Sequence, residues 1–390
     1  MEKDSCYYYC KAEAYREENE LDHAIKYYLK SALMNEHFKT YARLYECYFA
    51  RKQFDLANYF LTRSYQKNSN NEKVAFQYAM YLIQEKETAS AKKILADILK
   101  KNPMYKHAKL EFHKLEIQQK YQKLIQFLEE IKADYKRFLG AKSLHLLACY
   151  LWGFYMELLH IKPSFEALQS DKEAQVYELH DLKIWDFLAG FQRWIELKYA
   201  CKLTQSWSNI LRFHTEYEED AFDLFYQELY FYYQNGIFIE CEETNVTAKD
   251  SSCYRAENIQ IYGQDIAQIT FKNPQYHHEF YQQLWKVLTM IKNRPYLMTG
   301  EKSLTQTNIF LRGYIDAYNR SHQEEPAQTF FPGFEKWVNQ KERFKVYRPW
   351  HKIYLFITAN EEDAFDLFYA DLEEYMEIDT STAFPNPSYT

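Results

Sequence analysis

The sequence predicts an all-α protein in which N-terminal helical repeats precede two duplicated, mostly helical domains. Glycine occurs only 8 times and proline 9 times in 390 residues, so tight turns are scarce. Near the N-terminus, alanines recur 33 and 34 residues apart, a spacing that is typical of stacked helix pairs. Farther along, the stretch EEDAFDLFY occurs twice, at 218–226 and 361–369. Together these observations indicate a repeat region followed by a duplication.

The repeat region follows from the positions of Ala24, Ala57 and Ala91. In the stretch ELDHAIKYYLKSALMNE, Ala24, Tyr28 and Ser31 fall on one face of a helix, as the second helix of a pair requires. The pattern resembles tetratricopeptide repeats over residues 5–104, and we assign residues 1–117 to this domain. The resemblance implies either a concave surface that binds a peptide or protein, or a stacking platform.

The rest of the chain contains one domain in two copies. A shift of 143 residues aligns 190–232 with 333–375, and 20 of these 43 pairs are identical. A shift of 160 residues aligns GAKSLHLLACYLWGF with GEKSLTQTNIFLRGY. The first copy therefore carries 17 additional residues between these blocks, around PSFEALQSDKEAQVYELHDL. We place the first copy at 118–233, a linker at 234–277, the second copy at 278–376 and a flexible tail at 377–390.

Each copy shows the start signals of helices. The serine of KSL is a candidate cap, and in the second copy Asn360 precedes three acids, which the positive end of a helix dipole favours. Trp207, Ile210 and Phe213 fall three apart, which suits one face of a short helix, although a short strand stays open.

The acids of the repeated stretch have two interpretations. Favourable helix-start charges explain them, yet all four carboxylates are the same in both copies, whereas exposed-type positions such as Gln192/Glu335 and Glu196/Asn339 differ. The second interpretation is a shared surface that binds a partner. Its candidate residues are Glu218, Glu219, Asp220, Asp223, Glu361, Glu362, Asp363 and Asp366.

Charge is divided unevenly along the chain. Residues 1–117 hold 20 Lys and Arg against 16 Asp and Glu, which leaves 28 against 39 for the remainder. The acidic remainder disfavours nucleic acid and membrane phosphates and favours a basic protein partner. Seven cysteines without a CxxC pair, and no apolar run near the ~20 residues of a membrane span, favour a soluble, cytoplasmic protein.

No motif for catalysis or for a cofactor is present, so we expect no enzyme, no cofactor and no metal. Adjacent His277 and His278 point apart on a helix and cannot readily share a metal. Cys6 and Cys10 are expected to be small core residues. Lys142 and Lys302, which follow glycines, are expected to lie along the surface at helix starts rather than to hold a phosphate.

The second copy contains, in order, RPYLMTGEKSLTQTNIFLRGY, FEKWV, WHKIYLF and EEDAFDLFYADLEEY. This order resembles bacterial immunity-type domains that accompany polymorphic toxins. The resemblance implies a cytoplasmic protein that neutralises a cognate, basic, nuclease-like toxin by binding it, without a cofactor. The alternative is a helical-repeat scaffold or adaptor that binds a regulatory or secretion partner.

Overall fold

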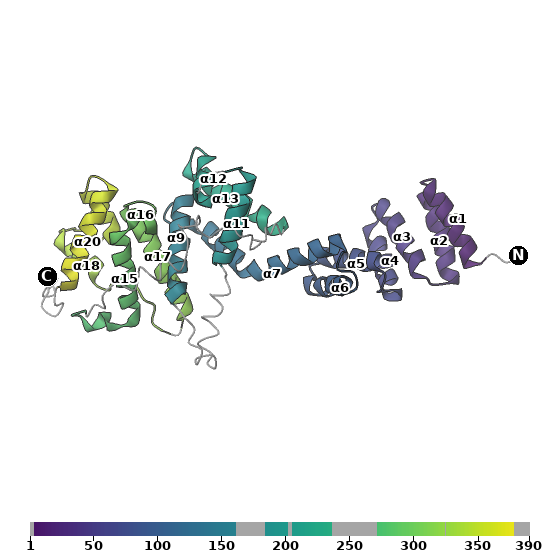
Figure 1. Ribbon diagram of the computed structural model, residues 1–390, viewed down its shortest axis with the longest axis horizontal. Coiled ribbons are helices and arrows are strands. Elements are labelled where there is room, and N and C mark those ends of the chain that lie inside the picture. The colour runs from purple at the N-terminus through teal and green to yellow at the C-terminus, as the bar shows by residue number, and fades with distance from the viewer. Residues whose placement is uncertain (1–3, 161–183, 202–204, 236–270, 324, 378–390) are drawn as a thin grey trace. The chain divides into compact units, whose positions relative to one another are not determined.

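The computed structural model describes residues 4–160, 184–201, 205–235, 271–323 and 325–377 (Figure 1). Within these ranges every regular element is a helix, which confirms the all-α prediction. The chain divides into two compact units, Met1–Lys120 with 234–236, and Tyr121–Tyr233 with 237–390. The boundary falls inside the long helix α7, Lys106–Ala133.

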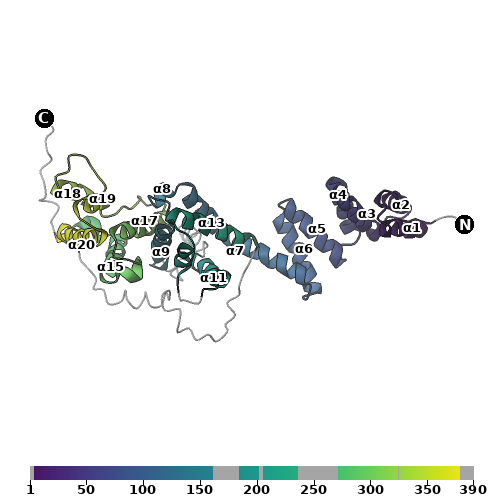
Figure 2. The same ribbon diagram turned by 90° about the horizontal axis from the view of Figure 1, so that it is seen from above.

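The first unit consists of three helix pairs and the beginning of α7 (Figure 2). The small residues predicted to let the helices approach, Ala24, Ala57 and Ala91, are completely buried. In the first two pairs a buried serine of the second helix donates a hydrogen bond to the start of the first helix. The helices are α1 (Ser5–Glu17), α2 (Leu21–Met34), α3 (Phe38–Ala50), α4 (Phe54–Lys67), α5 (Glu72–Gln84) and α6 (Thr88–Lys101).

The turn inside each pair repeats as well. Asn19, Lys52 and Lys86 adopt φ values of 61°, 60° and 65°, each just after the first helix of its pair. This left-handed conformation is the usual way to end a helix, although glycine adopts it at lower cost. The repeat therefore extends to backbone geometry that the side-chain pattern does not reveal.

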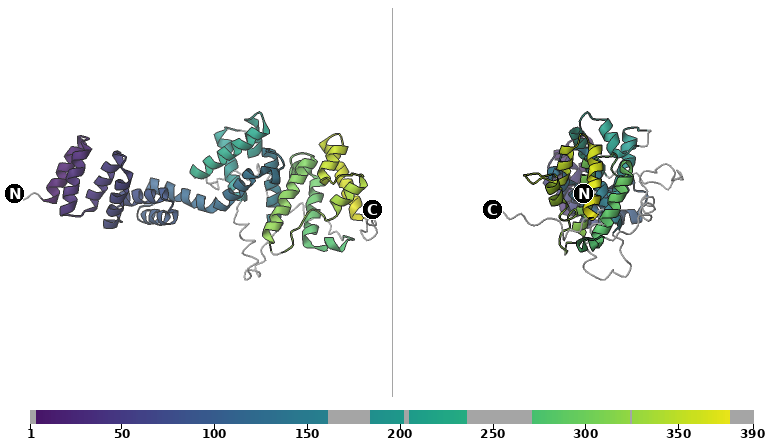
Figure 3. Two further views of the ribbon diagram at one scale, coloured as in Figure 1. Left: turned by 180° about the vertical axis from the view of Figure 1, so that it is seen from behind. Right: turned by 90° about the vertical axis from the view of Figure 1, so that its left-hand side faces the viewer.

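The second unit contains both copies, each built from the same series of helices (Figure 3). In the first copy the series begins with the end of α7, and in the second copy with α15, which follows the short 3₁₀ helix Pro274–His277. The first copy continues with α8 (Tyr135–Phe138), α9 (Leu144–His160), α11 (Ile184–Lys198), α12 (Trp207–Phe213) and α13 (Glu218–Asn235). The second copy has α15 (Glu279–Asn293), α16 (Pro295–Met298), α17 (Leu304–Ser321), α18 (Phe334–Lys341), α19 (Trp350–Ile357) and α20 (Glu361–Glu377).

Equivalent residues make equivalent contacts inside the two copies. The buried hydroxyl of Tyr226 donates to the carbonyl of Leu128 at 2.7 Å, and that of Tyr369 donates to Leu288 at 2.9 Å. The charge pair Lys198–Glu228 recurs as Lys341–Asp371. The duplication read from the sequence is therefore a duplication of the fold.

The two copies pack against each other through α9 and α17, which lie side by side in Figures 1 and 3. A Cβ on Gly153 of α9 would overlap the backbone carbonyl of Phe310, and a Cβ on Gly313 of α17 would overlap that of Tyr150. Gly153 and Gly313 are equivalent in the duplication, as are Tyr150 and Phe310. The contact is thus reciprocal, because the equivalent glycine of each copy packs against the equivalent aromatic residue of the other copy.

The segments around Trp207 and Trp350 form the helices α12 and α19, so the short strand is excluded there. Trp207 and Ile210 are buried as expected, but Phe213 is 85% exposed. The three residues therefore do not share one buried face. Phe213 follows Trp207 by six residues, which places it about 240° around the helix from Trp207.

Three predicted segments lie mostly or wholly outside the described residues. They are the additional residues of the first copy, the linker and the tail.

Candidate functional site

The first helices of the repeat pairs are joined by a chain of charged groups. Glu13 of α1 accepts hydrogen bonds from Tyr28 at 2.6 Å and from Arg43 of α3 at 2.9 Å. Arg43 also pairs with Glu46 at 2.7 Å, and Glu46 pairs with Lys73 of α5 at 2.8 Å. This charged ladder connects α1, α3 and α5 across three successive repeats.

The ladder determines the charge state of its carboxylates. Burial raises the pKa of Glu13, but hydrogen bonds from Tyr28 and Arg16 and the charge of Arg43 outweigh it and lower the pKa to about 2. Burial likewise raises the pKa of Glu46, and Lys73 and Arg43 outweigh it, so this pKa is lowered as well. Both side chains are therefore ionised at neutral pH.

Exposed groups lie beside the ladder on α3. Lys39 and Phe49 fall within the arc of α3 that contains Arg43 and Glu46, opposite the buried residues of the helix. Lys39 is exposed, and 51% of Phe49 is exposed. We call the face of α1, α3 and α5 that carries the ladder and these two residues the first-helix surface. It presents a cation and an aromatic ring to solvent, beside the charged ladder.

In the second unit, two of the eight candidate acids hold neighbouring helices together. Glu218 accepts from the hydroxyl of Ser143 at 2.9 Å and the backbone N–H of His145 at 3.3 Å. In the second copy Glu361 accepts from Ser303 and from the backbone N–H of Thr305, both at 3.0 Å. Ser143 and Ser303 also cap α9 and α17, as predicted. Each glutamate thus ties the start of one helix to the start of another.

Asp223 and Asp366 hold the same helix starts from one turn farther along. Asp223 pairs with Lys142, and Asp366 pairs with Lys302, each at 2.6 Å. The two lysines lie at helix starts, as expected, and their charges are directed to these carboxylates. These contacts account for four of the eight acids by packing and charge within each copy.

The other four candidate acids, Glu219, Asp220, Glu362 and Asp363, are exposed. Asn360 caps α20 as predicted, because its side chain accepts from the backbone N–H of Asp363 at 2.9 Å. The same asparagine donates to the Asp363 carboxylate at 2.9 Å. A partner-binding role for these four acids stays a prediction.

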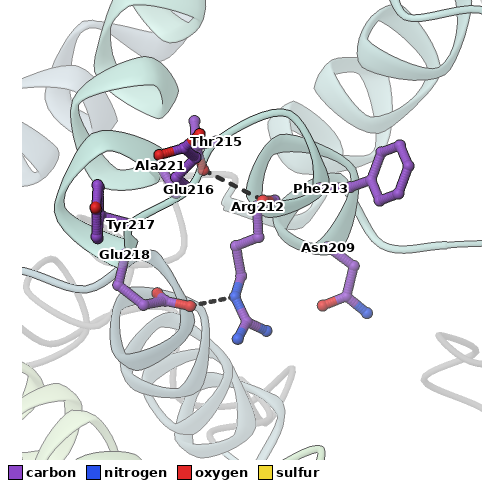
Figure 4. Close-up of a pocket in the computed structure, with 8 residues that line it drawn as sticks. All are labelled: Asn209, Arg212, Phe213, Thr215, Glu216, Tyr217, Glu218 and Ala221. Atoms are coloured by element: carbon purple, nitrogen blue, oxygen red, sulfur yellow. Dashed lines mark hydrogen bonds and ion pairs between the residues drawn. The ribbon is translucent and has the colours of Figure 1, made fainter.

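Phe213 and Phe356 were not among the candidate residues, yet both rings face solvent. They are equivalent in the duplication, and 85% and 77% of their surfaces are exposed. Phe213 borders a shallow hollow of about 360 Å³ that also contains the Arg212–Glu218 ion pair. Figure 4 shows its ring extending away from that pair. The identity of the two phenylalanines was visible in the sequence, but their exposure was not.

Cys6 and Cys10 are exposed, so their assignment to the core was wrong. They lie on the side of α1 away from Ala12, the buried residue of that helix. His277 contacts the carbonyl of Phe271, and His278 caps α15 through the N–H of Phe280.

No described group of three or more His, Cys, Asp or Glu side chains is arranged to hold a metal ion. No helix among the described residues has the length and apolar character needed to cross a membrane.

Comparison with known proteins gives a family match for part of the repeat region. Residues 48–110, which include α4, α5 and α6, match the tetratricopeptide repeat family. No curated protein matches the chain in sequence. Among solved structures, the crystal structure of yeast Tom70 aligns with this chain at 13% sequence identity and a TM-score of 0.28. The alignment covers 95% of this chain and 69% of the Tom70 chain. That TM-score is too low to indicate a common overall fold, so this likeness supports no conclusion about function.

Proposed function

We propose that this chain is a non-catalytic binding protein whose first-helix surface holds a protein partner. The observation that carries the proposal is the tetratricopeptide match over 48–110, since such repeats bind proteins or peptides or serve as stacking platforms. The charged ladder supports the binding alternative. It fixes α1, α3 and α5 in one rigid array, and a rigid surface loses little conformational entropy on binding.

Exchange of single exposed residues on the full-length chain tests this proposal. Phe49→Ser changes the first-helix surface, and Tyr59→Ser is the matched control on α4, because 55% of Tyr59 is exposed. Lysine cross-linking in cells of the source organism, followed by mass spectrometry, identifies partners and their contact points. We expect cross-links at Lys39 and Lys73 that are lost in Phe49→Ser and retained in Tyr59→Ser. Equal cross-linking in the two variants would contradict the proposal.

A second candidate function is neutralisation of a bacterial toxin by the duplicated domain. It is supported by the sequence order of the second copy, which resembles immunity-type domains, and by the four exposed acids Glu219, Asp220, Glu362 and Asp363. An acidic surface suits a basic, nuclease-like partner.

The test is survival of cells that express this chain together with any toxin encoded beside its gene. Replacement of the four exposed acids by serine should abolish protection without unfolding, because the partly buried contacts of Glu218 and Glu361 are left intact. Protection that persists in the fourfold variant would refute the acidic contact. Absence of any protection by the unaltered chain would remove this second candidate.

A further inference from the structure

Exposed positions of the two copies have mostly diverged. Examples are the pairs Asn209/Lys352, His214/Ile357 and Tyr217/Asn360, in which both members are exposed. Such divergence is expected at exposed positions, because surface substitutions usually change stability little. An exposed pair that stays identical therefore calls for a reason.

Among the identical exposed pairs, Lys198/Lys341 has a reason inside its own copy, which is the ion pair with Glu228 or Asp371. The pair Phe213/Phe356 has none of comparable strength. Phe213 meets the ring of His214, and Phe356 meets the ring of Phe344 at 6.0 Å, yet at least three quarters of each phenylalanine remains exposed. One exposed phenylalanine is ordinary in a soluble protein, but the same one in both copies is not.

The start of the helix that follows each ring is also the same in both copies. Phe213 is the last residue of α12 and Phe356 is the second-to-last residue of α19, and in both copies the next helix begins five residues after the phenylalanine with the acids Glu-Glu-Asp. The first of these acids is held by its neighbouring helix, as described above, whereas the second and third are exposed in both copies. An exposed apolar ring together with exposed carboxylates at the start of the next helix complements a segment that carries both an aliphatic side chain and a Lys or Arg.

We propose that Phe213 and Phe356 are the anchors of two equivalent docking surfaces, each of which takes a basic, amphipathic segment of a partner protein. The wider charge of the chain favours this occupant, since residues 118–390 hold 39 acids against 28 Lys and Arg. Aromatic side chains at the centre of an interface commonly carry most of its binding energy. The proposal rests on the chain being a binding protein, but not on the first-helix surface and not on the partner being a toxin.

A model peptide tests the chemistry of these surfaces. The full-length chain is titrated into a fluorescent helical peptide of lysine and leucine, and into a matched peptide of glutamate and leucine. We expect binding of the lysine peptide that weakens about tenfold in the double variant Phe213→Ser/Phe356→Ser. The control Tyr296→Ser removes a ring that is 66% exposed and whose counterpart in the first copy is Lys136, so it should bind as the unaltered chain does. Equal affinity of the double variant, or preference for the glutamate peptide, would overturn the proposal.

Photo-cross-linking tests the same surfaces with natural partners. The photoreactive analogue p-benzoylphenylalanine replaces residue 213, 356 or 296 of the full-length chain in the source organism. We expect adducts from positions 213 and 356 to lysine-rich or arginine-rich segments, with little adduct from position 296. These adducts should persist in Phe49→Ser, which separates this proposal from the one on the first-helix surface. Adduct yields at 213 and 356 no greater than at 296 would overturn it.

Discussion

The first and second copies share many internal contacts, but the helices α9 and α17, through which they meet, differ in several side chains. The glycine of the reciprocal contact is the same in both, but its preceding neighbour is Trp152 in α9 and Arg312 in α17. Farther along these helices, Glu157 of α9 corresponds to Ala317 of α17. The comparison separates residues that define the domain from residues that were free to change in one copy only. Substitutions in equivalent positions can test that division.

The largest effect is expected at the reciprocal contact itself. Gly153→Leu and Gly313→Leu each place a side chain into a backbone carbonyl of the other copy, which should cost about 3 kcal/mol or more of the free energy of unfolding. The two losses should be similar, because the contact is the same from both sides. Urea unfolding followed by tryptophan fluorescence measures them. Ala370→Leu, on the exposed face of α20, is the control, and a small loss at either glycine would break the equivalence.

Glu157 distinguishes the copies by its response to pH. Burial raises the pKa of this carboxyl to about 7, although a hydrogen bond with Tyr314 lowers it in part. Because the folded state holds the proton more tightly than the unfolded state, stability should fall as pH rises from about 4.5 to about 7. Glu157→Gln should remove this fall and be more stable than the unaltered chain at pH 8, by on the order of 3 kcal/mol. Identical pH profiles for the two proteins would show that Glu157 is not buried as described.

The glutamates at the helix starts should give smaller losses. Glu218→Gln and Glu361→Gln each weaken a charged acceptor of two hydrogen bonds, at a cost of about 1–2 kcal/mol each. Glu218 also pairs with Arg212, where the second copy has Leu355, and Glu361 also accepts from the hydroxyl of Thr305. Arg212→Leu should therefore reduce the loss caused by Glu218→Gln in a double-mutant cycle.

The pKa of Glu218 gives this prediction a pH dependence. Burial raises that pKa, but hydrogen bonds from Ser143 and His145 and the charge of Arg212 outweigh it, so the net shift is downward. The stabilisation is therefore present above the ordinary pKa of a glutamate and is lost in acid. Glu219→Gln, at an exposed position, should leave the free energy of unfolding unchanged both at neutral pH and in acid.

The smallest effect is expected at the ends of α11 and α18. Ala200 and Arg343, which are equivalent, adopt φ values of 48° and 55°. Replacement of either by glycine should relieve left-handed strain and raise the free energy of unfolding by about 0.5–1 kcal/mol. Thermal unfolding would show whether the two gains agree. If one of the two glycine variants were less stable than the unaltered chain, the side chain removed there would contribute more to the free energy of unfolding than the left-handed conformation costs.

The sequence was sufficient for the parts of the fold that depend on local spacing. Ala24, Ala57 and Ala91 predicted the repeats because close helix packing requires a small residue once in every pair. The caps at Ser143, Ser303 and Asn360 were predictable because a cap acts within three residues of its own position.

The sequence was not sufficient where partners are distant along the chain. Because Glu218 and Glu361 are the same in both copies, the sequence suggested that they bind a partner. Their actual partners, Ser143 and Ser303, lie 75 and 58 residues away along the chain, which is too far for a sequence pattern to connect them. Only the folded chain shows that these acids are held within their own copies. Exposure of Phe213 and Phe356 was hidden for a related reason, because a short helix gives too few turns for periodicity to define its buried face.

The meeting of α9 with α17 has the form of a homodimer interface enclosed within one polypeptide. Two separate subunits would associate only in proportion to their concentration, whereas covalently joined ones experience an effective concentration set by the tether. The association therefore does not weaken on dilution. In a symmetric homodimer every substitution occurs on both sides of the interface, whereas here one copy can change without the other. Trp152 beside Gly153 and Arg312 beside Gly313 are such one-sided substitutions.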